Sequence, residues 1–201
     1  MIWSSTKTEL IIAGIIIATT ILAVISAKAV SKEQQMDKPP LKDDIATVSY
    51  SKNGITFIYP NNYKITEEEI DENGMFSIRC ERKGEDISEI YIMTLTNDIF
   101  SVLSMEDVEY ACEATLESMQ EELKKNVLYK NCIFSKVQKG VLGDWPCYQK
   151  KFSLSILGVT TYGVIKEIIF GNGTILMTIA FYENDNYKQT LEQIEQSIKF
   201  E

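Results

Sequence analysis

The chain has 201 residues, of which 45% are hydrophobic, and a formal net charge of −9 from 20 basic and 29 acidic residues. This composition is sufficient for a hydrophobic core and excludes an intrinsically disordered chain. The excess of acidic residues argues against binding nucleic acid or anionic lipid through the protein's overall electrostatic field. The chain contains no histidine, which excludes Ser-His-Asp and Cys-His catalytic sets and histidine-containing zinc sites.

An uncharged, mostly apolar run opens the chain, from Leu10 to Ala27. A helix of this length roughly matches the hydrocarbon core of a bilayer, because each residue adds about 1.5 Å along the axis. The run also resembles a secretory signal peptide, since Ala27-Lys28-Ala29 fits a small-x-small cleavage site. We expect an uncleaved membrane anchor through residues 10–27. Cleavage at Ala29, which would release a secreted or periplasmic domain, is the alternative.

Two opposing signals bear on which side of the membrane the domain lies. Several lysines follow the apolar run and one, Lys7, precedes it, a bias that by the positive-inside rule keeps the domain in the cytoplasm. The likeness to an export signal favours the other side. We expect a membrane-anchored domain on the extracytoplasmic side.

A polar segment follows the apolar run. Residues 31–44 are polar and charged, and Pro39-Pro40 stiffens them into an extended chain, as expected of a tether. The predicted organisation is a signal anchor or signal peptide over 1–29, a polar tether over 30–45 and one folded domain over 46–201.

The first part of the domain has the pattern of short strands. Lys52-Asn53-Gly54 predicts a turn, because glycine tolerates a positive φ. Pro60 ends the second strand, since proline cannot donate to a ladder. Strands are expected over 47–50, 54–59, 75–81 and 87–96, with an edge segment over 63–66.

A long amphipathic helix is expected next. Ser104 has the features of an N-cap, and Asp107 three residues later is a variant of the capping box. Apolar residues then recur at helical spacing as far as Leu123, with Cys112 among them, and glutamates occupy the opposite side. This helix is expected to pack on the sheet.

The remaining chain predicts more strands and a closing helix. Turns at Leu157-Gly158 and Gly171-Asn172-Gly173 join the last three strands into an antiparallel meander, and a helix is expected from Asp185. The element order predicts an α+β fold, an antiparallel β-sheet with helices packed on it. The strand candidates are 128–137, which polar residues interrupt, 145–156, 160–170 and 174–182.

Residues 54–63, Gly-Ile-Thr-Phe-Ile-Tyr-Pro-Asn-Asn-Tyr, resemble the opening motif G-[IV]-x-F-x-[YF]-P-x-x-[YW] of the PsbP-like family, and Ile194, Ser197 and Phe200 resemble its closing I-x-x-S-x-x-F. The family includes photosystem II extrinsic proteins and bacterial exported proteins of unknown function. The resemblance covers residues 48–201 in element order. It implies an α/β/α sandwich and a non-catalytic binding or assembly module, exported or membrane-tethered.

The motif residues are structural, so no active site is carried over. Photosynthetic members can use histidine near metal, and this chain has none.

Four widely spaced cysteines contain no C-x-x-C pair: Cys80, Cys112, Cys132 and Cys147. A four-cysteine zinc site normally takes its ligands in close pairs, so this spacing argues against one. We favour buried thiols. One or two disulfides are the alternative if the domain is exported.

Three polar segments are weighed as ligand sites. Residues 66–72 lack the alternating ligands and glycine of an EF-hand and predict a solvated acidic loop. Residues 183–186 lack them too, and capping of the last helix explains Asp185. Residues 171–173 precede a strand and not a helix, so they form a hairpin and not a phosphate loop. We expect no metal, no cofactor and no catalytic residue.

Trp145 and Tyr148 are the candidate partner-binding residues. They point to opposite sides of a regular strand, so one of them could line a partner groove, where tryptophan and tyrosine are favoured. Packing in the core is the competing interpretation of both.

The sequence thus predicts a membrane-tethered or exported, non-catalytic binding or assembly module. Its partner would be an envelope protein or a small ligand, and not nucleic acid. A carrier of a small hydrophobic ligand would need an apolar cavity between helix and sheet. A carboxylate-based hydrolase, the weaker alternative, would need two acids that converge across a cleft.

Overall fold

The computed structural model describes residues 46–70, 75–84, 87–127, 129–156 and 158–200. The predicted anchor, cleavage site and tether lie outside these residues. Within the described part of the chain, no helix combines the length and the hydropathy needed to cross a membrane. The elements are β1 (Thr47–Lys52), β2 (Ile55–Pro60), β3 (Tyr63–Ile70), β4 (Met75–Arg82), β5 (Ser88–Thr96), α2 (Asp98–Ser101), α3 (Met105–Lys125), β6 (Tyr129–Phe134), β7 (Gln138–Leu142), β8 (Trp145–Ile156), β9 (Val159–Ile169), β10 (Thr174–Tyr182), α4 (Asp185–Gln196) and β11 (Lys199–Phe200).

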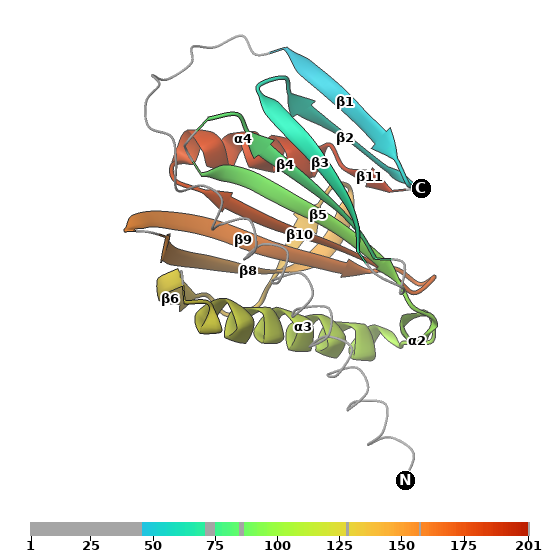
Figure 1. The fold of residues 1–201 in the computed structure, drawn as a ribbon. Helices are drawn as coiled ribbons and strands as arrows, with labels where there is room; N and C mark the ends of the chain where they lie inside the picture. Colours follow the sequence, from blue (N-terminus) through green and yellow to red (C-terminus); the bar gives the residue numbers. More distant parts are fainter. Residues whose placement is uncertain (1–45, 71–74, 85–86, 128, 157, 201) are drawn as a thin grey trace.

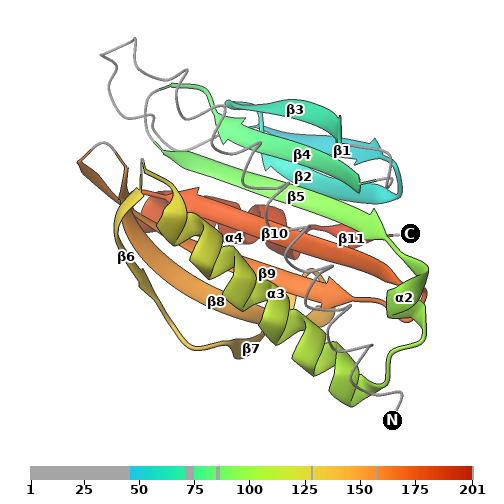
Figure 2. The same ribbon diagram turned by 60° about the horizontal axis from the view of Figure 1, so that its bottom comes forward.

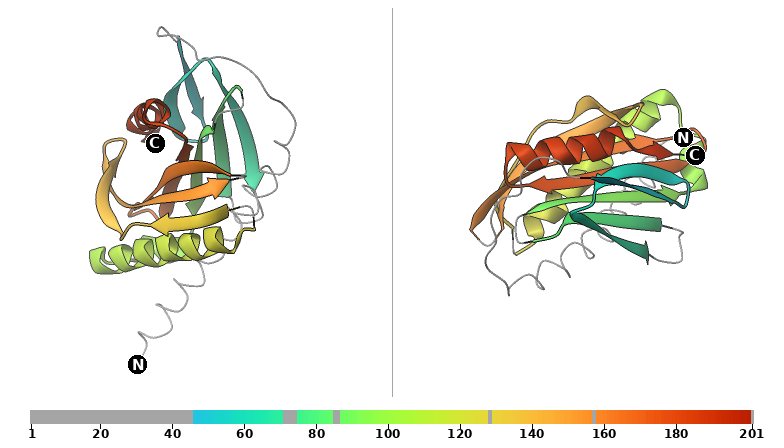
Figure 3. Two further views of the ribbon diagram at one scale, coloured as in Figure 1. Left: turned by 90° about the vertical axis from the view of Figure 1, so that its left-hand side faces the viewer. Right: turned by 90° about the horizontal axis from the view of Figure 1, so that it is seen from above.

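One large antiparallel sheet forms the centre of the domain (Figure 1). Its strand order is β3-β4-β5-β10-β9-β8-β6, and β7 also pairs with β8. Helix α3 covers one face and contacts β6, β8 and β9, as Figure 2 shows from below. Helix α4 and the small sheet β1-β2-β11 lie on the other face (Figure 3). The predicted α+β architecture, an antiparallel sheet with helices packed on it, is confirmed.

Two hydrophobic clusters hold these layers together. Between α3 and the sheet, Leu116, Met119 and Leu123 are fully buried and belong to one cluster with Phe152 and Ile165 of the sheet. Burial of side chains of this size contributes roughly 1.5–3 kcal/mol each. The second cluster lies between the other face, α4 and the small sheet, and it includes Ile55, Phe57, Leu176, Leu191 and Ile194. The interior is therefore packed on both sides of the sheet.

The predicted turns and caps define the ends of several elements. Asn53 and Gly54 join β1 to β2 with φ of 51° and 72°, the two positive values that a tight hairpin turn requires. The Ser104 hydroxyl caps α3 by accepting from the Asp107 N–H at 3.2 Å, as predicted. The last helix differs, because the Asn184 side chain accepts from the Tyr187 N–H at 3.1 Å. Asp185 is the first residue of that helix and not its cap.

Two further expectations are corrected by the structure. The first five residues of the segment 66–72 are not loop, because β3 continues to Ile70 and pairs along β4 as far as Met75. β3 is an edge strand of the large sheet, and charged residues are common on edge strands. The weak candidate over 128–137 contains β6, and residues 135–137 belong to no strand. β7, which alternation alone did not indicate, begins at Gln138.

Candidate functional site

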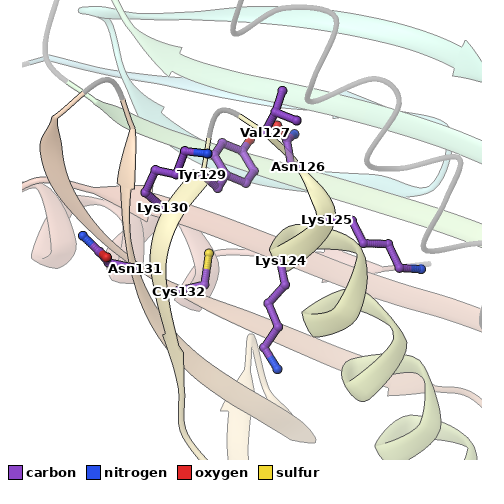
Figure 4. A pocket seen from close by; sticks show the side chains of 8 residues that line it. All are labelled: Lys124, Lys125, Asn126, Val127, Tyr129, Lys130, Asn131 and Cys132. Carbon is purple, nitrogen blue, oxygen red and sulfur yellow. The ribbon is translucent and has the colours of Figure 1, made fainter.

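A surface hollow of about 390 Å³ lies where α3 ends and β6 begins, and we call it the α3–β6 hollow. Figure 4 shows the lining side chains arranged around this junction. Two of the lining residues are lysines of the last turn of α3. The other lining residues belong to the connection after α3 and to β6. The lining residues are Lys124, Lys125, Asn126, Val127, Tyr129, Lys130, Asn131 and Cys132.

The end of α3 forms one wall of this hollow. Asn126 leaves the helical conformation with φ −67° and ψ 121°, and its N–H still bonds to the Leu123 carbonyl. The Tyr129 N–H then donates to the Asn126 carbonyl at 3.1 Å, which fixes how the chain enters β6. Lysines in the last turn complement the partial negative charge at a helix C-terminus. Lys124 and Lys125 thus have a local structural reason to be there.

A β-bulge in β6 forms the other wall. Lys130 pairs with Ser155 and Ile133 pairs with Ser153, so Asn131 and Cys132 together oppose a single residue of β8. Asn131 has φ of 53°, a conformation that asparagine tolerates better than most residues. In a regular strand, Tyr129 and Cys132 would point to opposite faces. The bulge instead turns both toward the α3 side of the sheet, where Tyr129 is buried and Cys132 is half-buried.

The charged side chains that line the hollow are all lysines. Lys124 lies 2.9 Å from a Glu121 carboxylate oxygen and Lys125 lies 2.6 Å from one of Glu122, both exposed pairs along α3. Such pairs are weak because solvent screens them. Lys130 is exposed on β6 and forms no ion pair with any described residue. No carboxylate lines the hollow.

Four glutamates are buried among the described residues, and they test the hydrolase hypothesis. Glu167 is fully buried on β9, and neither carboxyl oxygen has a hydrogen-bond partner in the described part of the protein. Burial raises its pKa well above the ordinary value, and the nearby Thr115 hydroxyl opposes that effect. This hydroxyl donates to the Ala111 carbonyl at 3.0 Å. Burial without a partner therefore favours the neutral form of this carboxyl group.

The second buried acid, Glu195 on α4, is held by two partners. Lys166 Nζ lies 2.6 Å from one of its oxygens and the Thr178 hydroxyl donates to the other at 2.8 Å. Burial raises the pKa of Glu195, and Lys166 opposes the shift. Lys166 also donates to the Val141 carbonyl at 3.1 Å, so this group connects α4, β9, β10 and β7. Its geometry is that of a structural ion pair.

A third charged cluster lies on β4 and β5. The Arg79 Nε donates to a Glu89 oxygen at 2.9 Å, and the same guanidinium contacts Glu81 and lies over the Tyr91 ring. Glu81 also binds Lys64. Acids and bases are matched within this cluster, which makes it an ion-pair network. Among the described residues, no three metal-ligating side chains are placed to hold a metal ion.

Trp145 and Tyr148 do not form one surface. Trp145 is partly buried and packs edge-on against Phe170 with ring centres 5.5 Å apart, beside the second cluster. Tyr148 packs beside the first cluster, with Lys139 6.0 Å above its ring. The two therefore lie on opposite faces of β8, and neither lines the α3–β6 hollow.

The four predicted cysteines are separate free thiols. Cys80, Cys112 and Cys147 are buried, and burial raises the pKa of Cys80 to about 12 and of Cys147 to about 11. Cys132 is half-buried at the hollow. Its pKa is raised by burial and lowered in part by Lys124.

Sequence reasoning missed the residues that define these sites. Lys130 and Asn131 lay in the strand candidate that polar residues interrupt, and that interruption was the available signal of a bulge. Lys166 and Glu167 were a second signal, of buried charged groups within the sheet. Neighbouring residues of a strand point to opposite faces, so each face of this apolar strand has to accommodate one charged side chain.

No family model and no curated protein sequence matches the chain. Among solved structures, cyanobacterial PsbP (CyanoP) from Synechocystis sp. PCC 6803 is similar, with a TM-score of 0.54 and 10% identity over 83% of this chain and 99% of its own. At this identity the likeness concerns the fold. The described domain has the PsbP-like fold that the sequence resemblance implied.

Two other solved structures are less similar. One is a protein of Bacteroides thetaiotaomicron VPI-5482, with a TM-score of 0.46 and 14% identity over 74% of this chain and 45% of its own. The other is Mycobacterium tuberculosis LpqN, described as involved in cell envelope biogenesis, with a TM-score of 0.43 and 14% identity over 78% of this chain and 91% of its own.

Proposed function

We propose that this chain is a non-catalytic binding module, held at a membrane by residues 10–27 with the folded domain on the extracytoplasmic side. The partner is an envelope protein or a small ligand, and it binds at the α3–β6 hollow. The observation that carries this proposal is the position of the hollow. It opens at the surface between a helix end and a bulged strand, and none of the four buried glutamates lines it.

The packing on both faces of the sheet also favours binding over the alternatives. A hydrolase with two acids needs them to converge on one cleft. Glu167 lies under α3, whereas Glu195 lies on the α4 side. Glu81 and Glu89 are neighbours on paired strands, but Arg79 binds both of them in the ion-pair network. A carrier needs an apolar cavity between helix and sheet. Leu116 and Met119 instead pack directly into the cluster that fills that space.

Protease accessibility tests the membrane part of the proposal. Protease is added to intact and to permeabilised spheroplasts that express the full chain, and the product is followed in membrane and soluble fractions. A full-length, membrane-bound protein that is digested in intact spheroplasts is expected. A shortened soluble product would show cleavage at Ala29, and protection until permeabilisation would overturn the extracytoplasmic placement. Photo-crosslinking from Val127, at the hollow, tests where the partner binds.

A further inference from the structure

The chemistry of the α3–β6 hollow points to one class of ligand. Its polar side chains are three ammonium groups, two carboxamides, the Tyr129 phenol and the Cys132 thiol, and no carboxylate lines it, in a chain whose net charge is −9. A neutral or cationic ligand would have little to gain from three adjacent lysines. An oxyanion accepts hydrogen bonds from every one of these donors.

Local structure explains the presence of two of the three lysines but not of the third, Lys130. Lys124 and Lys125 complement the helix end and bind Glu121 and Glu122 along the helix. Solvent-exposed pairs of this kind exchange readily with other anions. Lys130 is not at a helix end, and no described acid pairs with it. Lys130 is the last residue of β6 that pairs with β8 before the bulge, and its side chain lines the hollow.

The bulge supplies the second, independent observation. It is formed at the cost of a left-handed residue, Asn131 with φ of 53°, and it interrupts the pairing of β6 with β8. Backbone of this kind is enriched next to functional sites, where it re-aims side chains. Lys130 and Asn131 line the same hollow as the helix-end lysines, and the four side chains leave the backbone in different directions around it (Figure 4).

We propose that the α3–β6 hollow binds the phosphate group of a soluble phosphate ester or of a lipid headgroup. This inference rests on the proposed binding function and names the chemistry that the site recognises. Lys130 is the central cation, Lys125 and Lys124 turn from their glutamates toward the phosphate, and the Asn131 amide donates to it. A phosphate carries up to two charges and three acceptor oxygens, which suits three lysines better than a carboxylate does.

Calorimetric titration of the full chain in detergent micelles tests this inference. Inorganic phosphate is titrated near pH 7.5 at constant ionic strength into wild type, Lys130→Gln and Lys199→Gln. Lys199 is exposed on β11, on the other side of the sheet, so its variant loses the same charge away from the hollow. We expect Lys130→Gln to bind about tenfold more weakly or worse, because a hydrogen bond to a charged group is lost. Lys199→Gln should bind as wild type does.

Three results would overturn the inference: no binding of phosphate by wild type, equal losses in both variants, or acetate binding as tightly as phosphate. Vesicles that contain phosphatidylglycerol, added as competitors, separate the two sources, because displacement of phosphate identifies a headgroup. Failure here is distinguishable from failure of the proposed function. If a partner crosslinks from Val127 while phosphate does not bind, the proposed binding function stands and the phosphate inference is wrong.

Discussion

Glu167 and Glu195 are both buried carboxyl side chains, and they lie on opposite faces of the same sheet. Lys166 and Glu167 are neighbours on β9, so their side chains point to opposite faces. Lys166 binds Glu195 on the α4 side, at 2.6 Å, which leaves Glu167 on the α3 side. The sheet therefore separates the two acids, and each makes its own contribution to stability.

Glu167 should make the protein less stable as pH rises. Its folded pKa is raised by burial, whereas an unfolded glutamate titrates at about 4.3. Between these two values the native state binds more protons than the unfolded state, so the free energy of unfolding falls with increasing pH. In Glu167→Gln, the free energy of unfolding should decrease less steeply with pH, and the urea midpoint at pH 8 should be higher than in wild type.

The control for that experiment is Glu113→Gln, an exposed position on α3. Its pH profile should run parallel to wild type. Glu195 also has a raised pKa, so part of the fall remains in both variants. An unchanged slope in Glu167→Gln would show that this carboxyl group is not neutral in the folded protein.

Removing Lys166 should destabilise the protein more than removing the whole ion pair. Lys166→Met leaves Glu195 buried without its cation, which we expect to cost about 3–5 kcal/mol in urea unfolding. In the double variant Lys166→Met, Glu195→Gln, the neutral amide keeps a bond to Thr178, and part of the loss should be recovered. Simply additive losses would contradict the assigned pairing.

Gly163 should not tolerate alanine. A Cβ there would lie 2.1 Å from the Phe152 ring and 2.4 Å from the Ala180 carbonyl oxygen. Because the carbonyl belongs to the backbone of β10, repacking Phe152 alone cannot relieve the clash. Gly163→Ala should therefore lose about 1–3 kcal/mol. Gly171→Ala is the matched control, since its Cβ would meet nothing within 4 Å. Equal thermal midpoints in both variants would refute this packing.

Cys132 should be the first thiol to react with a maleimide in the folded protein. It is half-buried, and Lys124 partly offsets the rise of its pKa, whereas the other three thiols are buried. Thiolate access controls the rate. Counting labels by mass spectrometry should give one fast site, absent in Cys132→Ser. Fewer than four labels after denaturation without reductant would instead support the disulfide alternative.

Much of the fold was predictable because it depends on local patterns. Successive residues of β8, β9 and β10 alternate between the two hydrophobic clusters. The apolar residues of α3 recur at helical spacing and pack into the first cluster. Ser104 and Asn53-Gly54 specify an end and a turn by their own chemistry. Features that depend on distant partners were not predictable. The pairing of β11 with Ile55 and Thr56, for example, involves two residues, too few for a periodic signal.

The candidate site was missed for the same reason. A bulge in β6 is defined by its register against β8, which no single strand reveals. Nor does the sequence show that the end of α3 meets Lys130. Trp145 and Tyr148 lie on opposite faces of β8, as the alternation along the strand predicted, and their role in binding a partner stays a prediction.

The most direct test of the binding function is photo-crosslinking in intact cells. A photoreactive residue replaces Val127, which lines the hollow and is 77% exposed, or Val48, which is 41% exposed on β1 in the small sheet. Our account predicts a discrete adduct from position 127, lost with Lys130→Glu and retained with Lys199→Glu, and none from position 48. The same adducts from both positions, or an adduct from 127 that Lys130→Glu leaves unchanged, would contradict the assignment of the α3–β6 hollow as the binding site.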